Sequence, residues 1–213
     1  MRAEILKISS DSPETSLVKY AADQIRAGEV LGMPTDTFYG LAADPFNLRA
    51  VDRVYEIKTR SRHKPLSLLI ENVDQAEELA KGLPEEFYAL ARKFWPGPLT
   101  IIVKAGSRLP LKVTANTGHV ALRVPNAKIP LAVVTAAAIP ITATSANLSG
   151  ASECTSADQV REQLEGRISI IVDGGTSPRD TPSTIIDLTD EEARWKIIRE
   201  GAIPREEISG FFA

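Results

Sequence analysis

The sequence predicts an α/β fold in which an open, twisted, mixed sheet is covered by flanking helices. Segments with helical spacing of apolar residues alternate with short apolar runs that are typical of buried strands. Several of these runs follow one another with no helix between them, which argues against a regular doubly wound fold. No repeat, low-complexity segment or linker interrupts residues 1–213, so we expect a single domain.

In the first half of the chain, apolar periodicity and stop signals define the elements. The helix at 16–27 stops before Gly28, and Pro34 ends the strand that follows it. Pro84 stands at a favourable first-turn position, and 95–98 (WPGP) breaks the chain before the next strand. The predicted helices are 16–27, 47–57, 73–80 and 85–94, and the predicted strands are 29–33, 66–70 and 99–104.

In the second half the alternation continues. We expect Thr155 to cap the helix that follows it, and 173–175 (DGG) to end a buried strand. The predicted helices are 131–138, 156–164 and 205–212, and the predicted strands are 120–124, 140–143, 168–172, 184–188 and 195–199.

Composition limits the classes of protein that the chain can represent. Its 213 residues are 43% hydrophobic and 25% charged, as in a soluble globular protein. The single Cys154 excludes an intrachain disulfide and a Cys-based zinc site, and His63 and His119 are too few for a His-rich metal site. We therefore predict no metal site. No signal-peptide pattern or membrane-spanning run occurs, so we expect a cytoplasmic protein without a membrane partner.

The strongest local charge lies at 58–64 (KTRSRHK), where seven positions carry four of the 25 Lys and Arg residues in a chain of net charge −3. The cluster connects a predicted helix to a predicted strand, so buried elements hold both of its ends. Such a cluster either binds an anionic ligand or forms a solvated loop, and this segment alone leaves both explanations open.

Familiar nucleotide and hydrolase motifs are missing from the sequence. It has no G-x-x-x-x-G-K-[ST] loop, no G-x-G-x-x-G fingerprint and no G-x-S-x-G elbow. Polar side chains gather instead at the ends of apolar strands, where open α/β sheets bind ligands. They are Thr35, Thr37, Lys58, Arg60, Arg123, Ser145, Asn147, Ser183 and Thr184. Each of them is also compatible with a turn or a solvated surface position.

Eight ordered motifs give the chain a family resemblance over about 16–201. They are 34–41 (PTDTFYGL), Lys58-x-Arg60 with 64–66 (KPL), 95–100 (WPGPLT), 120–125 (VALRVP), 144–150 (TSANLSG), 173–175 (DGG), 182–187 (PSTIID) and Ile198-Arg199-x-Gly201. In this order they resemble the YrdC-like family of threonylcarbamoyl-adenylate synthases. The resemblance implies an open α/β sheet curled around a deep positive groove.

The resemblance also implies a reaction and its site. L-Threonine, bicarbonate or CO2, and ATP would give threonylcarbamoyl-adenylate and diphosphate, for the modified adenosine next to some tRNA anticodons. Thr35, Arg123 and Ala143 resemble threonine-binding residues, and Lys58 and Arg60 resemble catalytic groups that neutralise phosphate. The residues that resemble ATP-binding positions are Lys58, Arg60, Lys64, Ser145, Asn147, Ser183 and Arg199.

The residues themselves agree with such a reaction. Threonine carbamate is already a carboxylate nucleophile, so a site rich in Lys, Arg, Ser and Thr can work by positioning and electrostatic stabilisation. The expected substrate is ATP with Mg²⁺, with no tightly bound cofactor. The expected partners are downstream tRNA threonylcarbamoyl-transferase proteins, with weak or no direct binding of tRNA.

Three features depart from the family pattern. The sequence stops soon after Gly201, which resembles a short form without the additional C-terminal domain of some members. Glu200 stands where Pro is common, and 149–156 does not align with the pattern, so contacts there are not predicted.

Two alternative functions come from other classes. A module for double-stranded RNA or tRNA would use a positive groove, but the net charge is −3 and no basic-aromatic pattern runs along an element. A carbamoyl-transfer domain of hydrogenase maturation would have a similar sheet beside zinc modules, and the single cysteine and the 213-residue length argue against it.

Overall fold

The computed structural model describes residues 3–190 and 192–212. Its helices are α1 (Thr15–Arg26), α2 (Leu48–Lys58), α3 (Val73–Leu79), α4 (Glu85–Phe94), α5 (Lys128–Ala137), α6 (Ala157–Leu164) and α7 (Arg205–Phe211). Its strands are β1 (Glu4–Lys7), β2 (Leu31–Met33), β3 (Gly40–Ala42), β4 (Ser67–Leu69), β5 (Leu99–Lys104), β6 (His119–Arg123), β7 (Ile141–Thr142), β8 (Thr144–Ser145), β9 (Ile170–Asp173), β10 (Thr184–Asp187) and β11 (Lys196–Arg199).

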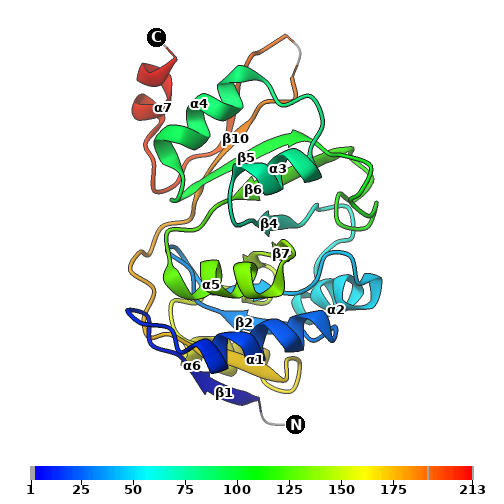
Figure 1. The fold of residues 1–213 in the computed structure, drawn as a ribbon, viewed down its shortest axis with the longest axis vertical. Helices are drawn as coiled ribbons and strands as arrows, with labels where there is room; N and C mark the ends of the chain where they lie inside the picture. Colours follow the sequence, from blue (N-terminus) through cyan, green and yellow to red (C-terminus); the bar gives the residue numbers. More distant parts are fainter. Residues whose placement is uncertain (1–2, 191, 213) are drawn as a thin grey trace.

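The strands form two mixed sheets stacked along the long axis of the molecule (Figure 1). One sheet has the order β1-β9-β2-β3-β8, and the other has the order β11-β10-β5-β6-β4-β7. The described N-terminal end of the chain lies with the first sheet and the described C-terminal end with the second (Figure 1). The predicted mixed α/β class with flanking helices is confirmed, and its strands divide between these two sheets.

The first sheet is buried on both faces by helices. Alternate side chains of a strand point to opposite faces, so Leu31 packs with the cluster formed by α1 and α5, while Gly32 lies against Val160 of α6. Ile171 likewise packs on the α6 side, between Ile170 and Val172 on the other. Central parallel strands that are covered on both faces read as continuous apolar runs, which explains why 168–172 was recognisable.

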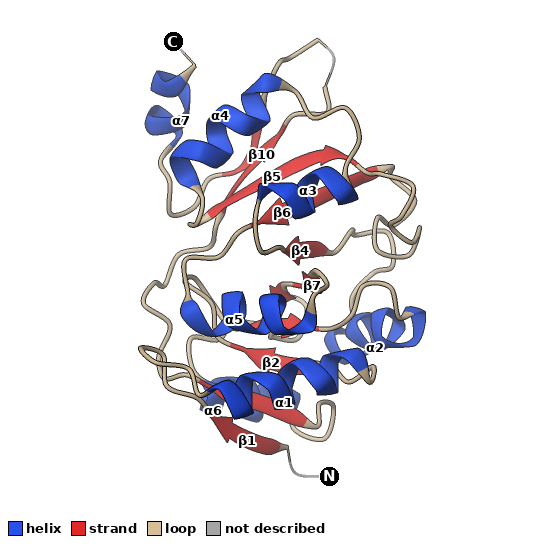
Figure 2. Cartoon of the chain, in the orientation of Figure 1, coloured by secondary structure: helices blue, strands red, loops and turns tan. Residues whose placement is uncertain are grey.

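The second sheet carries helices on one face and polar side chains on the other. Figure 2 shows α3 and α4 lying across this sheet, with α7 beside α4. In β5, Leu99, Ile101 and Val103 belong to the hydrophobic core, whereas Thr100 and Ile102 line a cavity. The strands β6 and β10 repeat this alternation, since Arg123 and Ile185 line the cavity while Leu122 and Ile186 belong to the core. Consecutive residues of β4 and of β11 line it.

Over its described residues the chain passes between the two sheets three times, after β3, after β7 and after β9, and the second passage is the shortest. Ile141 and Thr142 pair with β4 of the second sheet, and Thr144 and Ser145 pair with β3 of the first. Between them, the Ala143 N–H donates to Ser67 O at 2.8 Å. The segment therefore passes from one sheet to the other at Ala143.

Most predicted elements occur, and the differences have local causes. The strand expected at 140–143 is divided into β7 and β8 by the passage at Ala143, and α5 begins at Lys128 instead of 131. Ser156, not Thr155, caps α6, because the Ser156 hydroxyl accepts the Gln159 N–H at 3.3 Å. The sequence did not predict β1 or β3. Within the described part of the chain, no helix is long and apolar enough to cross a membrane.

Candidate functional site

A cavity of about 450 Å³ lies between the two sheets and brings together most of the predicted site residues. Eight of the ten line it: Thr35, Arg60, Lys64, Arg123, Ala143, Ser145, Ser183 and Arg199. Lys58 and Asn147 do not line it. They lie behind Ser145, as their hydrogen bonds show.

Arg123 lines the cavity, and most of its hydrogen-bond donors are bound to the protein. Only 6% of Arg123 is exposed. Its Nε donates to Gly97 O at 3.0 Å, one Nη donates to Thr37 Oγ1 at 3.1 Å, and the other forms a buried ion pair with Asp36. Since a guanidinium has five N–H donors, two remain for a ligand in the cavity.

The loop after β2 orients hydroxyl groups beside Arg123. Thr35 Oγ1 donates to Phe38 O at 2.7 Å and accepts the Thr37 N–H at 3.1 Å, a local turn of the kind that Thr favours. The Tyr39 hydroxyl closes the loop by donating to Gly175 O at 2.6 Å. Burial raises the pKa of Tyr39 to about 12, so it remains a neutral donor. The loop is thus held in one conformation by its own hydrogen bonds.

Lys58 is the last residue of α2, and 2% of it is exposed. Its ammonium donates to Asn147 O at 2.8 Å, to Asn147 Oδ1 at 2.9 Å and, at close range, to Ser145 O. Burial, with a smaller contribution from Arg60, lowers the pKa of Lys58 to about 8. Three oxygen acceptors favour the charged form, so Lys58 holds the Ser145–Asn147 turn as an ammonium at neutral pH.

The loop after α2 turns the next cation into the cavity. Thr59 adopts a left-handed conformation that ends the helix, and Tyr55 anchors the loop by donating to Lys64 O at 3.0 Å. Arg60 donates to Pro65 O at 3.1 Å, while its Nε is buried without a hydrogen-bond partner among the described residues. Burial lowers the pKa of Arg60, yet an arginine stays charged at neutral pH. Arg62 turns the other way, toward Asp52 and Glu56.

The turn after β8 is fixed by interlocking polar groups. The Ser145 hydroxyl donates to Asn147 Oδ1 at 2.7 Å, and the Asn147 amide donates to Ala151 O at 2.6 Å. These bonds, together with those of Lys58, leave Ser145 as the member of the turn that lines the cavity. Asn147 does not line the cavity, but it is hydrogen-bonded to Ser145, which does.

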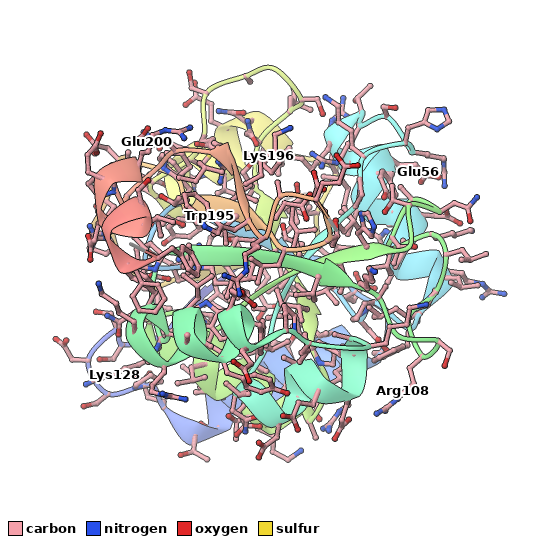
Figure 3. The ribbon with its side chains drawn as sticks, turned by 90° about the horizontal axis from the view of Figure 1, so that it is seen from above. Glu56, Arg108, Lys128, Trp195, Lys196 and Glu200 are labelled. Atoms are coloured by element: carbon pink, nitrogen blue, oxygen red, sulfur yellow. The ribbon has the colours of Figure 1, made fainter. Side chains whose placement is uncertain are left out.

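Arg199 reaches the cavity from the edge strand β11. Its Nε and one Nη donate to Ser183 O at 3.2 and 2.9 Å, and Ser183 in turn bonds Thr100 Oγ1 at 2.9 Å. Gly201 allows this approach, because a Cβ there would lie 2.2 Å from Pro182 O. Glu200 accepts the Arg205 N–H at 3.0 Å and lies beside α7, where Figure 3 labels it. The departure at Glu200 therefore leaves Arg199 in place.

Sequence reasoning did not select several residues that line the cavity. Ser67 and Thr100 do so because they alternate with core residues along β4 and β5, and this period could have identified them. Glu153 and His63 come from loops that carry no such signal. Glu153 is the one carboxylate lining the cavity in the described part of the chain, against four cationic side chains, so the lining favours anions.

The fold and the cavity define an α/β protein whose cavity between two sheets has a lining that favours an anionic ligand. A comparison of sequences agrees, because residues 23–201 match the family model Sua5_yciO_yrdC, described as telomere recombination. The chain belongs to this Sua5/YciO/YrdC family, as its motifs predicted.

Individual relatives support the assignment. The chain is 40% identical over 193 residues to the threonylcarbamoyl-AMP synthase of Pyrococcus abyssi, covering 90% of this chain and 56% of that protein. It is 37% identical over 203 residues to the threonylcarbamoyl-AMP synthase of Bacillus subtilis, covering 95% and 57%. The crystal structure of P. abyssi Sua5 complexed with L-threonine superimposes with a TM-score of 0.94 at 38% identity, over 98% of this chain and 61% of that one. The chain thus spans a little over half the length of these relatives.

Proposed function

We propose that this chain is an L-threonylcarbamoyladenylate synthase, which joins L-threonine, bicarbonate or CO2, and ATP into threonylcarbamoyl-AMP and diphosphate. The observation that carries the proposal is the excess of cationic side chains in the cavity lining. Arg123 is paired with Asp36, whereas Arg60, Lys64 and Arg199 have no carboxylate within ion-pair distance among the described residues. Relatives of this name and the threonine complex of P. abyssi Sua5 support the choice of substrates.

Threonine would bind next to Arg123. The two N–H groups of Arg123 that are not bound to protein would hold a carboxylate, and Thr35 would contact the amino acid with its hydroxyl. Ala143 would contribute its backbone, which lies where the chain passes between the sheets. The two N–H groups would hold the carboxylate in one orientation through charge-assisted hydrogen bonds.

ATP would occupy the cationic part of the cavity. Arg60, Lys64 and Arg199 would offset the charge of the triphosphate, and Ser145 and Ser183 would contact the nucleotide. Lys58 and Asn147 would act by holding Ser145 in position. Within the described residues no group of three or more His, Cys, Asp and Glu could hold a metal, so Mg²⁺ is proposed to enter bound to ATP, where it shields phosphate charge.

The chemistry requires two bond-forming steps. The free amine of threonine attacks CO2 and releases a proton, or attacks bicarbonate and releases water, and either route gives the carbamate. A carbamate oxygen then attacks the α-phosphorus in line, a new O–P bond forms, and the bond to the bridging oxygen breaks to release diphosphate. Arg60 and its neighbours stabilise the charge that develops on the phosphates, which is worth about 10²–10³-fold for one preorganised donor.

The product is a mixed anhydride that would pass its threonylcarbamoyl group to tRNA through downstream transferase proteins. An RNA-binding module is the competing function, and a cavity of about 450 Å³ between the two sheets favours small substrates over an extended phosphate backbone.

One assay tests the proposal directly. The protein is incubated with ATP, Mg²⁺ and bicarbonate, with threonine, alanine or no amino acid, and diphosphate is measured. We expect diphosphate only with threonine and bicarbonate both present. Equal release with alanine, or with no amino acid, would refute the proposed reaction.

A further inference from the structure

A second cavity, of about 410 Å³, lies on the other side of the loop that carries Thr35. Its walls come from the start of α5, from the segment 174–178 and from Pro34, Thr35 and Ser10. Thr35 lines both cavities, so the two are separated by a single loop. Nothing in the proposed reaction uses this second cavity.

The N-terminus of α5 opens into this cavity without a cap. The N-cap residue is Ala127, whose side chain makes no capping hydrogen bond. The N–H groups of Lys128 and Ile129 have no acceptor within the helix, and Pro130 has no N–H at all. An uncapped helix start presents donors and a partial positive charge, which together attract an anion.

Ser177 provides an independent sign that a ligand belongs here. Ser177 lines the cavity and is 8% exposed, and its hydroxyl is buried without a hydrogen-bond partner among the described residues. Its backbone is held in place, because the Ser177 N–H donates to Thr155 O at 2.7 Å. A buried hydroxyl without a partner is costly, so a bound acceptor would remove this cost.

The charge of the lining has one sign. Lys128 is the one charged residue among the described residues that line this cavity, and no Asp or Glu lines it. The Lys128 ammonium donates to the backbone oxygen of Asp11 at 2.7 Å, which leaves its charge uncompensated. Figure 3 labels Lys128 at the edge of the molecule, next to the N-terminal segment.

Most of the remaining lining is apolar, and its other polar members are Ser10, Thr35, Asn126 and Thr176. Five prolines line it together with Ile129 and Leu131: Pro34, Pro96, Pro125, Pro130 and Pro178. Gly174 lies so close to this wall that a Cβ there would meet Ile129 Cδ1 at 2.5 Å. The volume is several times the roughly 30 Å³ that one water occupies, so a bare inorganic anion would leave most of the apolar wall without contact.

We propose that this second cavity is a binding site for a small organic carboxylate with a short branched apolar tail. The carboxylate would accept the N–H groups of Lys128 and Ile129 and the hydroxyl proton of Ser177. The tail would pack against the prolines. The site does not depend on the synthase reaction, so it can be tested without any measurement of activity.

The test follows backbone amide resonances of the ¹⁵N-labelled protein during titration with 2-methylpropanoate. We expect saturable shifts at Lys128, Ile129 and Ser177. Neutral 2-methylpropanamide has the same tail without the charge and should leave these resonances unshifted. Orthophosphate and bicarbonate are titrated as bare oxyanions and should bind more weakly than 2-methylpropanoate.

Two variants and a control locate the effect. Ser177→Ala removes one hydrogen bond to a charged group and should weaken binding roughly tenfold. It should not lower the melting temperature, because the hydroxyl has no protein partner. Ala127→Asp supplies a capping carboxylate, so it should abolish binding and raise the melting temperature. Ser107→Ala alters an exposed serine outside the cavity and should bind as the wild type does.

Several results would overturn the proposal. Unshifted Lys128 and Ile129 amides, equal shifts with the neutral amide, or unchanged binding in Ala127→Asp would each exclude a carboxylate site here. Tighter binding of orthophosphate or bicarbonate would show that the apolar wall contributes nothing, and that the ligand is a bare oxyanion.

Discussion

Arg123 and Lys58 are both buried cations, and they differ in what neutralises them. Arg123 forms an ion pair with Asp36, whereas the Lys58 ammonium is surrounded by neutral oxygens of Ser145 and Asn147. The charge of Arg123 is therefore compensated, while the charge of Lys58 adds to that of Arg60 beside it. The two cations therefore have different roles. The ion pair with Asp36 orients the N–H donors of Arg123, whereas the charge of Lys58 contributes to the positive potential near Arg60.

The largest effect should follow from breaking the compensated pair. Arg123→Met leaves the Asp36 carboxylate buried and unpaired, which typically costs about 3–5 kcal/mol of unfolding free energy. Adding Asp36→Ala should recover much of this stability without restoring threonine binding. Urea unfolding and calorimetric titration with threonine measure the two effects. If the double variant bound threonine normally, Arg123 would have no role in binding threonine.

Substitution of a cation that has no carboxylate partner should change folding little and should lower catalysis strongly. Arg60→Ala should lower the rate of diphosphate formation by about 10²-fold, the scale of one lost electrostatic group. Its circular dichroism should match that of the wild type. Arg53→Ala is the matched control, since Arg53 lies on α2, the helix that precedes Arg60, and pairs with Glu29 outside the cavity. Full activity of Arg60→Ala would show that the basic cluster at 58–64 is a solvated loop and does not take part in the reaction.

A smaller effect should appear with pH, because burial lowers the pKa of Lys58 toward neutrality. The pKa of Lys58 lies at about 8, below its ordinary 10.5, so raising the pH from about 7 to 9.5 removes its proton in the folded protein. One acceptor in the Ser145–Asn147 turn then loses its donor, and ATP affinity should fall several-fold. Calorimetry at both pH values measures this change.

The control for this pH dependence is Lys58→Met, which should bind ATP weakly and equally at both values. The same pKa shift should raise the unfolding free energy between about pH 8 and 10.5, because there the unfolded chain binds a proton that the folded chain has lost. A wild-type affinity that did not change with pH would show that Lys58 does not support the nucleotide subsite.

The smallest expected effect is that of tRNA. A cavity of about 450 Å³ with four cationic side chains can neutralise few phosphates, so duplex or tRNA binding should be weak and lost at moderate salt. Adding tRNA should leave the initial rate of diphosphate formation unchanged. A severalfold acceleration at physiological salt would show that the positive region extends beyond the small-molecule site.

The elements that could be predicted are those whose signal is local. The apolar runs at 99–104 and 168–172 were visible because those strands are buried. By contrast, β1 has only four residues and β3 reads Gly-Leu-Ala, so each is a strand because of its partners and not because of its own propensity.

The same distinction holds in the site. Six of the eight predicted residues that line the cavity lie in strands or near their ends, whereas Arg60 and Lys64 lie in the loop between α2 and β4. The buried position of Lys58 could not be predicted, because its acceptors are 87 and 89 residues away along the chain. The Asp36 partner of Arg123 is equally distant, at 87 residues, and no local pattern identifies it.

The passage of the chain at Ala143 has a consequence for the whole molecule. The first cavity takes Thr35 and Ser145 from one sheet region and Arg123 and Ser183 from the other, so a molecule bound there acts as a non-covalent cross-link between them. A ligand at a hundred times its Kd raises the free energy of unfolding by about 2.7 kcal/mol. Because such a ligand contacts residues of both sheets, the association of the two sheets is most stable while the cavity is occupied.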